Sequence, residues 1–380
     1  MLVILSFKKQ RNISVIILFL LSSIIFLPQF FNSKVHANDS KVEKCIISLK
    51  NPSDLSSFDL NKVKVKKKYK NFPFVAVEIP ENEIQKVKGN PNVSFIEEDG
   101  SIHGLNQVIP WGVSSVNATS VFTKEVYGSG VKIGILDTGI DYLHEDLNVS
   151  GGISFVEGSP DFYDDNGHGT HVAGIIGALN NSIGVAGVAP KANLYAIKVL
   201  DKNENGNYSD VISGIDWAIS NGMDLINMSF GGDTPSQSLQ IAVDKAYSAG
   251  ILLVSSSGNN GDNKNGSITY PAALSSVIAV GAVNEQNKRA SFSSVGKELE
   301  IMAPGVNIES TYPGGYITLS GTSMAAAYVT GVAALVLEGK PYLTNIELRS
   351  LLSKTSNPLG NPFYYGKGFV DAINAINYKK

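Results

Sequence analysis

The stretch VKIGILDTGID, Val131–Asp141, decides the fold. Its run VKIGIL is rich in β-branched residues and leads into Asp137 and a glycine turn, a pattern typical of a buried strand that ends in a carboxylate. Similar runs alternate with helical patterns along the rest of the chain. The predicted strands are Val131–Leu136, Asn193–Val199, Asp224–Met228, Ile251–Ser256 and Val277–Val283, and the predicted helices are His168–Leu179, Ser209–Asn221, Ser236–Ala249, Thr322–Leu337 and Thr344–Thr355. This alternation predicts an α/β fold of three layers, with a parallel sheet covered by helices on both faces.

The position of polar residues predicts where a ligand would bind on this sheet. In open parallel sheets the ligand crevice lies beyond the carboxyl ends of the strands. Asp137 and the segment Ser256–Asn259 follow two of the predicted strands. We therefore expect a site at this edge.

The segment Asn38–Leu105 has a different pattern, with short elements that predict a separate, small α+β domain of the ferredoxin-like kind. We expect strands at Lys44–Lys50, Lys62–Lys70, Pro73–Ile79 and Val93–Glu97, and a helix at Glu81–Lys88. The run KVKVKKKYK could be a polybasic surface. However, Val63 and Val65 alternate with lysines, and the segment holds 11 Lys against 10 acidic residues, which favours a half-solvated strand.

The first 37 residues have the pattern of a signal peptide. Lys8, Lys9 and Arg11 precede the apolar run Ile13–Leu27, and Ala37 ends a short Val-His-Ala segment. As a helix this run would span about 22 Å, less than the roughly 30 Å of a hydrocarbon core. We expect export into the extracellular medium with cleavage after Ala37 and no stable membrane anchor; the alternative is an uncleaved anchor. The expected parts are a signal peptide (1–37), the small domain (38–105) and the main domain (106–380).

Composition excludes some functions. The chain of 380 residues is 43% hydrophobic with 37 glycines, which indicates a globular protein. Its net charge is −3, and residues 106–380 carry −8 from 16 basic and 24 acidic residues, which argues against nucleic-acid binding. Cys45 is the only cysteine, so no intrachain disulfide can form. Stability must come from packing or a bound metal.

Four polar residues stand where a strand meets a loop or a helix. They are Asp137, His168 in DDNGHGTHVAG, Asn259 in SSSGNNG and Ser323 in LSGTSMAAAYV. Each has an ordinary structural explanation when taken alone. Asp137 could cap a turn, Asn259 could simply occupy one, and Ser323 could cap a helix. His168 could be a packed core histidine, or could share a zinc ion with His171.

The four residues together, in the order Asp, His, Asn, Ser, give a more specific pattern. DTGID, GHGTHVAG and SGTSMA resemble the subtilisin family of serine proteases, and the resemblance extends over nearly all of the chain after the signal peptide. It implies a secreted serine endopeptidase with Ser323 as nucleophile, His168 as general base and Asp137 as the residue that orients the imidazole. The Asn259 side chain and the Ser323 backbone N–H would form the oxyanion hole.

The resemblance also implies a substrate site for polypeptides. In NMSFGG, the residues Ser229, Phe230 and Gly231 would pair with the substrate backbone as an added strand. A pocket between this segment and Ser256–Gly258, with Thr269 at its floor, would take the side chain before the cut bond. Its apolar walls suggest large uncharged side chains. The substrate-binding set is therefore Ser229, Phe230, Gly231, Ser256, Gly258 and Thr269.

Structural calcium is the cofactor that the resemblance implies. Its ligands would come from residues near the start of the main domain and from the loop ALNNSIGV. They are Gln107, Asp146, Leu179, Asn181, Ile183 and Val185. A plain turn after the His168 helix is the alternative explanation of the loop.

The segment before Asn106 resembles the family's propeptide, which assists folding and then inhibits the enzyme. Its tail would be IEEDGSIHGL, with self-cleavage between Leu105 and Asn106 and a monomeric mature enzyme. One departure is Ala326, Ala327 and Tyr328, where the family usually has serine, proline and histidine. Two alternatives stay open, an inactive peptide-binding homologue and a processing protease for one precursor. An α/β-hydrolase esterase is disfavoured because no GxSxG motif is present.

Overall fold

A computed structural model describes residues 41–51, 62–100, 107–262 and 265–379. The chain divides into two compact units, Met1–His103 and Gly104–Lys380. The expected signal peptide (1–37) and the expected cleavage site at Leu105 and Asn106 lie outside the described residues.

The first unit is a four-stranded antiparallel sheet with one helix among its described residues. Its elements are β1 (Val42–Leu49), β2 (Lys64–Lys68), β3 (Phe74–Pro80), α1 (Glu81–Lys88) and β4 (Val93–Glu98), and the strand order is β2-β3-β1-β4. Cys45 is buried in its apolar core. Two lysines of the basic run, Lys64 and Lys66, pair with Glu78 on the neighbouring strand, so the run is a solvated strand face.

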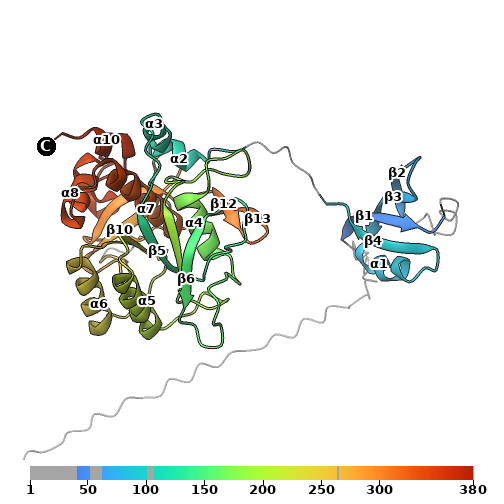
Figure 1. Cartoon of the computed structure of the whole chain (residues 1–380), viewed down its shortest axis with the longest axis horizontal. Helices are drawn as coiled ribbons and strands as arrows, with labels where there is room; N and C mark the ends of the chain where they lie inside the picture. The colour runs from blue at the N-terminus through green and yellow to red at the C-terminus, as the bar shows by residue number, and fades with distance from the viewer. Residues whose placement is uncertain (1–40, 52–61, 101–106, 263–264, 380) are drawn as a thin grey trace, which may run out of the picture. The chain divides into compact units, whose positions relative to one another are not determined.

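The second unit is built on a sheet of seven parallel strands (Figure 1). The strands are β5 (Lys132–Asp137), β6 (Val149–Ser154), β7 (Asn193–Lys198), β8 (Leu225–Met228), β9 (Leu252–Ser256), β10 (Val277–Val283) and β11 (Leu299–Pro304). Their order is β11-β10-β9-β8-β5-β7-β6. The predicted parallel sheet is confirmed.

Helices cover both faces of this sheet, as expected. The described helices are α2 (Trp111–Ser115), α3 (Ala118–Phe122), α4 (His168–Gly177), α5 (Tyr208–Ser220), α6 (Gln237–Ser248), α7 (Thr322–Gly339), α8 (Asn345–Thr355), α9 (Pro362–Tyr365) and α10 (Ala372–Asn377). Ile133 and Ile135 of β5 pack in one apolar core with α4 and α7, whereas Leu136 packs in a second core with α5 and α6. Neighbouring strand residues face opposite layers because side chains alternate along a strand.

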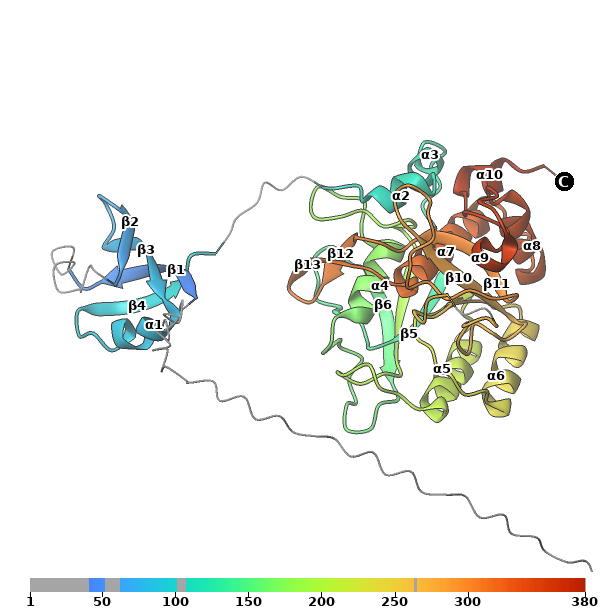
Figure 2. The ribbon, with the colours of Figure 1, turned by 180° about the vertical axis from the view of Figure 1, so that it is seen from behind.

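The elements that the sequence did not predict are at the margins of the domain. The edge strand β6 reads VSGGIS, and glycine weakens the strand signal. The opposite edge strand β11 ends at a proline. A hairpin of β12 (Ile308–Tyr312) and β13 (Gly315–Leu319) packs beside α4 (Figure 2). Its turn at Pro313 and Gly314 is a recognisable sequence signal.

The central helix α7 is the one described helix long and apolar enough to cross a membrane. However, 83% of its apolar window is buried within the domain. Its apolar character is therefore that of a core helix.

The core around α7 contains a buried phenol. Tyr328 is fully buried, and its hydroxyl has no hydrogen-bond partner among the described residues. Burial raises the pKa of this hydroxyl. Gly112 of α2 lies against the ring, where a β-carbon would come within 2.3 Å of Cζ. Tyr328, which stands where the resembled family usually has histidine, thus requires the glycine opposite it.

Replacing Tyr328 by phenylalanine should stabilise the protein. A buried hydroxyl without a partner costs about 1–3 kcal/mol, so Tyr328→Phe should raise the apparent Tm by a few degrees. The matched control is Tyr312→Phe, which removes a hydroxyl that donates to Asn166 O at 2.7 Å and should lower the Tm. Calorimetry of both variants at one scan rate tests this. An equal loss of Tm in the two variants would show that the Tyr328 hydroxyl has a partner.

Candidate active site

Asp137 and His168 form a buried pair at the carboxyl end of the central strand β5. Asp137 has no exposed surface, and its Oδ1 lies 2.7 Å from His168 Nδ1. The same oxygen accepts the Thr138 N–H at 2.8 Å. Since Oδ1 faces Nδ1, this nitrogen carries the proton in the neutral ring, and Nε2 is left as the acceptor. His168 is the first residue of α4, and its side chain is 14% exposed.

A second buried carboxylate, which the sequence analysis did not single out, holds the His168 loop. Asp164 Oδ1 accepts hydrogen bonds from the Thr138 hydroxyl and from the Gly167 N–H, both at 2.8 Å. Its Oδ2 accepts from the N–H and the hydroxyl of Thr170. Asp164 therefore ties the residue after Asp137 to the residues on both sides of His168.

Lys198 reinforces the same connection from β7. Its side chain is fully buried, and its ammonium donates to Asp165 Oδ1 at 2.7 Å and to the backbone carbonyl of Thr138. A buried ammonium is tolerated only when it is paired and hydrogen-bonded. One of its partners is the residue after Asp137, and the other lies three residues before His168.

The two histidines of α4 have opposite electrostatic environments. Burial alone would lower the pKa of His168, but the charge of Asp137 and the hydrogen bond to it outweigh this and raise the pKa to about 9. Burial lowers the pKa of His171 to about 4. His171 Nε2 faces the carbonyls of Ile308 and Ile317, at 3.1 and 3.2 Å. It is a packed core histidine, and no group of three or more His, Cys, Asp or Glu residues in the described part of the chain could hold a metal ion.

Ser323 lies at the N-terminus of α7, next to the segment that follows β8. Its hydroxyl donates to Ser229 O at 2.9 Å, and the Ser229 hydroxyl donates back to Ser323 O at 3.0 Å. Asn227 Nδ2 in turn donates to the Ser229 hydroxyl at 2.8 Å. The structure brings Ser323 into the cleft that His168 also lines, without a hydrogen bond between the two side chains.

Asn259 is oriented by the first residue of α7. Its Oδ1 accepts the N–H and the hydroxyl of Thr322, at 3.1 and 3.0 Å. Because a backbone N–H can only donate, the atom facing it must be the amide oxygen, and this determines the orientation of the amide. The Nδ2 group is then left as a donor beside the start of α7.

The residues expected to bind substrate all line one cleft of about 330 Å³ together with His168, Asn259 and Ser323. The Thr269 hydroxyl lies where β-carbons on Gly231 and Gly258 would be, 2.2 and 3.0 Å away, so the two glycines leave room for this floor residue. The backbone N–H and C=O of Gly231 make no hydrogen bond among the described residues. They are free to pair with an extended chain.

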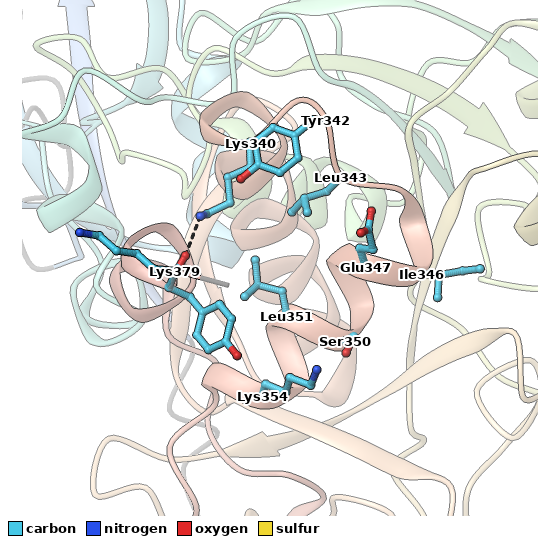
Figure 3. Close-up of a pocket in the computed structure, with 10 residues that line it drawn as sticks. Lys340, Tyr342, Leu343, Ile346, Glu347, Ser350, Leu351, Lys354 and Lys379 are labelled. Atoms are coloured by element: carbon cyan, nitrogen blue, oxygen red, sulfur yellow. Dashed lines mark hydrogen bonds between the residues drawn. The ribbon is translucent and has the colours of Figure 1, made fainter.

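A second hollow lies elsewhere on the main domain and contains none of these residues. Figure 3 shows it between the end of α7, α8 and the C-terminal residues, lined by Tyr342, Leu351 and Lys354 among others. Its walls carry no nucleophile and base in contact.

The predicted calcium ligands also come together in the structure. Gln107 Nε2 is surrounded by four oxygens at 2.6–3.5 Å, namely Leu179 O, Asn181 Oδ1, Ile183 O and Val185 O. Asp146 is buried beside them, and its carboxylate accepts from Asn181 Nδ2 and from the Val185 N–H, both at 2.9 Å. Burial raises the pKa of Asp146.

Comparison with known proteins identifies the family of this chain. The sequence profile of the subtilase family matches residues 128–368. Subtilisin NAT of Bacillus subtilis subsp. natto is 47% identical, over 96% of this chain and 98% of that protein. The chain belongs to the subtilase family. A thermostable alkaline protease of Halalkalibacterium halodurans is 45% identical, over 91% of this chain and 95% of that protein. The M-protease of Shouchella clausii is 48% identical, over 80% of this chain and 79% of that protein.

Membership of the subtilase family makes this protein a subtilisin-like serine endopeptidase, which acts on polypeptides. Sequence reasoning missed Asp164 and Lys198, the two buried residues that hold the Asp137–His168 pair of this subtilase. Asp164 opens the quoted motif DDNGHGTHVAG, so its position was a usable signal. Lys198 follows Ala196 and Ile197 at the buried end of its strand, and a charged residue there was the other signal.

The two histidine pKa values can be measured directly. In the Ser323→Ala protein, NMR titration of ¹³C-labelled histidines should show His168 titrating above 6.5 and His171 well below it. Because the neutral imidazole is the base, the base form grows as pH rises through the raised pKa.

Asp137→Asn should lower the pKa of His168, because it removes the charge that favours the protonated ring. The control Asp161→Asn changes an exposed carboxylate and should leave the pKa of His168 unchanged. A titration of His168 at or below 6.5 in the parent protein would contradict the coupling.

Proposed function

We propose that Ser323 is the nucleophile, His168 the general base and Asp137 the residue that orients and stabilises the imidazole. The observation that supports this most directly is the buried contact between His168 Nδ1 and Asp137 Oδ1, which leaves Nε2 facing a cleft that Ser323 also lines. For attack, the Ser323 hydroxyl leaves Ser229 O and donates to Nε2. The serine oxygen adds to the scissile carbonyl as its proton passes to His168.

The tetrahedral intermediate would place a negative oxygen at the start of α7. The Asn259 Nδ2 group and the Ser323 N–H are the donors proposed for it, because the first is oriented by Thr322 and the second is an unpaired amide at a helix N-terminus. His168 then gives its proton to the departing amine. Water attacks the acyl-serine in the second half of the reaction and restores the Ser323 hydroxyl.

Substrate would bind as an extended strand along Ser229, Phe230 and Gly231. The free backbone groups of Gly231 support this, since backbone pairing accepts many sequences. The side chain before the cut bond would enter the pocket above Thr269, between Gly231 and Gly258. We expect broad specificity with large uncharged side chains at that position.

We further propose that the protein is exported, that residues 38–105 serve as its propeptide, and that it releases itself by cutting between Leu105 and Asn106. The signal-peptide pattern of the first 37 residues and the compact first unit of the chain support this. A propeptide would assist the folding of the seven-stranded sheet. Such a sheet folds slowly, because its parallel pairing joins residues far apart in sequence. The mature enzyme is expected to be a monomer.

The loop around Gln107 fits a structural calcium ion. An amide group has two N–H donors and cannot serve four oxygens, whereas a hard cation is bound by such a set of carbonyl, amide and carboxylate oxygens. Gly184 allows the loop to pass Asp146, because it has φ of 53° and a β-carbon there would meet Asp146 Oδ2 at 2.4 Å. Calcium would hold Gln107 and the loop together, away from the proposed chemistry.

The first test is the Ser323→Ala variant, with intact mass and N-terminal sequence of the secreted protein. Wild type should begin near Asn106 and digest unfolded casein. The variant should stay uncut and lose at least about 10⁴-fold in activity. The control Ser320→Ala changes an exposed serine three residues earlier and should mature normally. A Ser323→Ala protein that matures and digests equally well would exclude Ser323 as the nucleophile.

Calcium binding is tested on mature enzyme blocked by a serine-directed sulfonyl fluoride, so that self-digestion does not interfere. Calcium at about 100 times its Kd adds roughly 2.7 kcal/mol of stability, so chelation should lower the apparent Tm. Asp146→Asn should abolish most of the difference in apparent Tm between the calcium-loaded and the chelated enzyme. Asp216→Asn, at a 70% exposed side chain, should keep it. Equal calcium dependence in both variants would contradict the site.

A further inference from the structure

The cleft carries two carboxylates that the proposed mechanism does not use. Glu204 and Asp233 are exposed residues that line it together with His168 and Ser323. None of its lining residues is a lysine or an arginine. Within the described part of the chain, neither carboxylate forms an ion pair or a side-chain hydrogen bond, so both negative charges are available to a ligand.

Glu204 stands at the tip of a well-defined turn between β7 and α5. Asp201 closes this turn, because its Oδ1 accepts the N–H groups of Asn203 and Asn205 at 2.8 and 2.9 Å and its own N–H donates to Asn205 O at 2.8 Å. Asn166 Nδ2 also donates to Lys202 O at 3.0 Å, which joins the turn to the loop before His168. The charge of Glu204 lies close enough to His168 to contribute to its raised pKa.

Asp233 approaches the cleft from the segment that follows β8. It follows Gly231 by two residues, and Gly232 is held by a pair of 2.9 Å backbone hydrogen bonds to Tyr270. Its charge acts on Tyr208, whose pKa is raised by burial and then by Asp233. Tyr208 lies four residues after Glu204, at the start of α5. The two carboxylates therefore stand on two segments that border the same part of the cleft.

We propose that Glu204 and Asp233 select substrates with a lysine or arginine side chain two to four residues before the cut bond. This inference rests on the proposed function, in which the segment 229–231 pairs with residues that precede the cut. Asp233 lies beyond Gly231 and faces residues further upstream, whereas Glu204 faces those nearer to His168. A long cationic side chain can reach a carboxylate at the rim while the backbone stays paired.

The expected selectivity is moderate, because both carboxylates are exposed. Ion pairs of this kind change affinity by factors of a few each, and salt screens them. We therefore expect a preference of about 3–10-fold in kcat/KM for lysine over glutamine at low ionic strength. Glutamate at the same position should be worse than glutamine, and 0.5 M NaCl should reduce both differences.

The test uses fluorogenic peptides with phenylalanine before the cut and a single lysine, glutamine or glutamate two, three or four residues upstream. The lysine-to-glutamine ratio of kcat/KM is measured within each enzyme, so a general change in rate cancels. Glu204→Gln with Asp233→Asn should bring the ratio to about one. Asp216→Asn removes an exposed charge outside the cleft and should keep the wild-type ratio.

Two results would overturn the inference: a wild-type ratio near one, or a wild-type ratio that persists in the double variant. Either can occur while the glutamine peptide is still cut, and the proposed endopeptidase function then stands. If wild-type enzyme cuts none of the peptides, the proposed function itself fails.

Discussion

The buried charge of Asp137 is the constraint on which the rest of the main domain depends. A carboxylate with no exposed surface costs several kcal/mol unless neighbouring groups compensate it. The Thr138 N–H and His168 do so at one oxygen, whereas Oδ2 has no hydrogen-bond partner among the described residues. The position of His168 therefore matters for the stability of the buried Asp137 carboxylate as well as for the proposed chemistry.

The surrounding structure is organised to keep this pair in register. Strands β5 and β7 are neighbours in the sheet, and Asp137 lies opposite Lys198 in their register. Lys198 and Asp164 then connect the turn after β5 with the loop that leads into α4. The hydrogen bonds of Asp164 to Thr138 and Gly167 are buried, so they form in a low dielectric, where losing a partner is costly. Such a scaffold would hold the proposed general base without requiring a rearrangement during the reaction.

The same main domain has no disulfide to stabilise it, since the only cysteine lies in the first unit. Its two apolar cores on either side of the sheet supply most of the packing. The loop around Gln107 brings many oxygens and a single carboxylate together, and the charge of an ion would stabilise that arrangement. Residues 106–380 have a net charge of −8, which favours the cation binding proposed for the loop and for the cleft rim.

The sequence alone determined the fold class, the central strands and most of the long helices, because apolar periodicity reports directly on burial. It also placed Asp137, His168, Asn259 and Ser323 at strand ends and helix starts. Edge strands such as β6 were missed, since a glycine-rich, partly exposed strand leaves little pattern. Only the tertiary structure decided which side chains meet. Three examples are the hydrogen bond of Asp164 to Thr138, the orientation of Asn259 by Thr322, and the position of Glu204 and Asp233 at one cleft. Each joins segments far apart in sequence, and contacts of this kind follow from packing in three dimensions and leave no local periodicity.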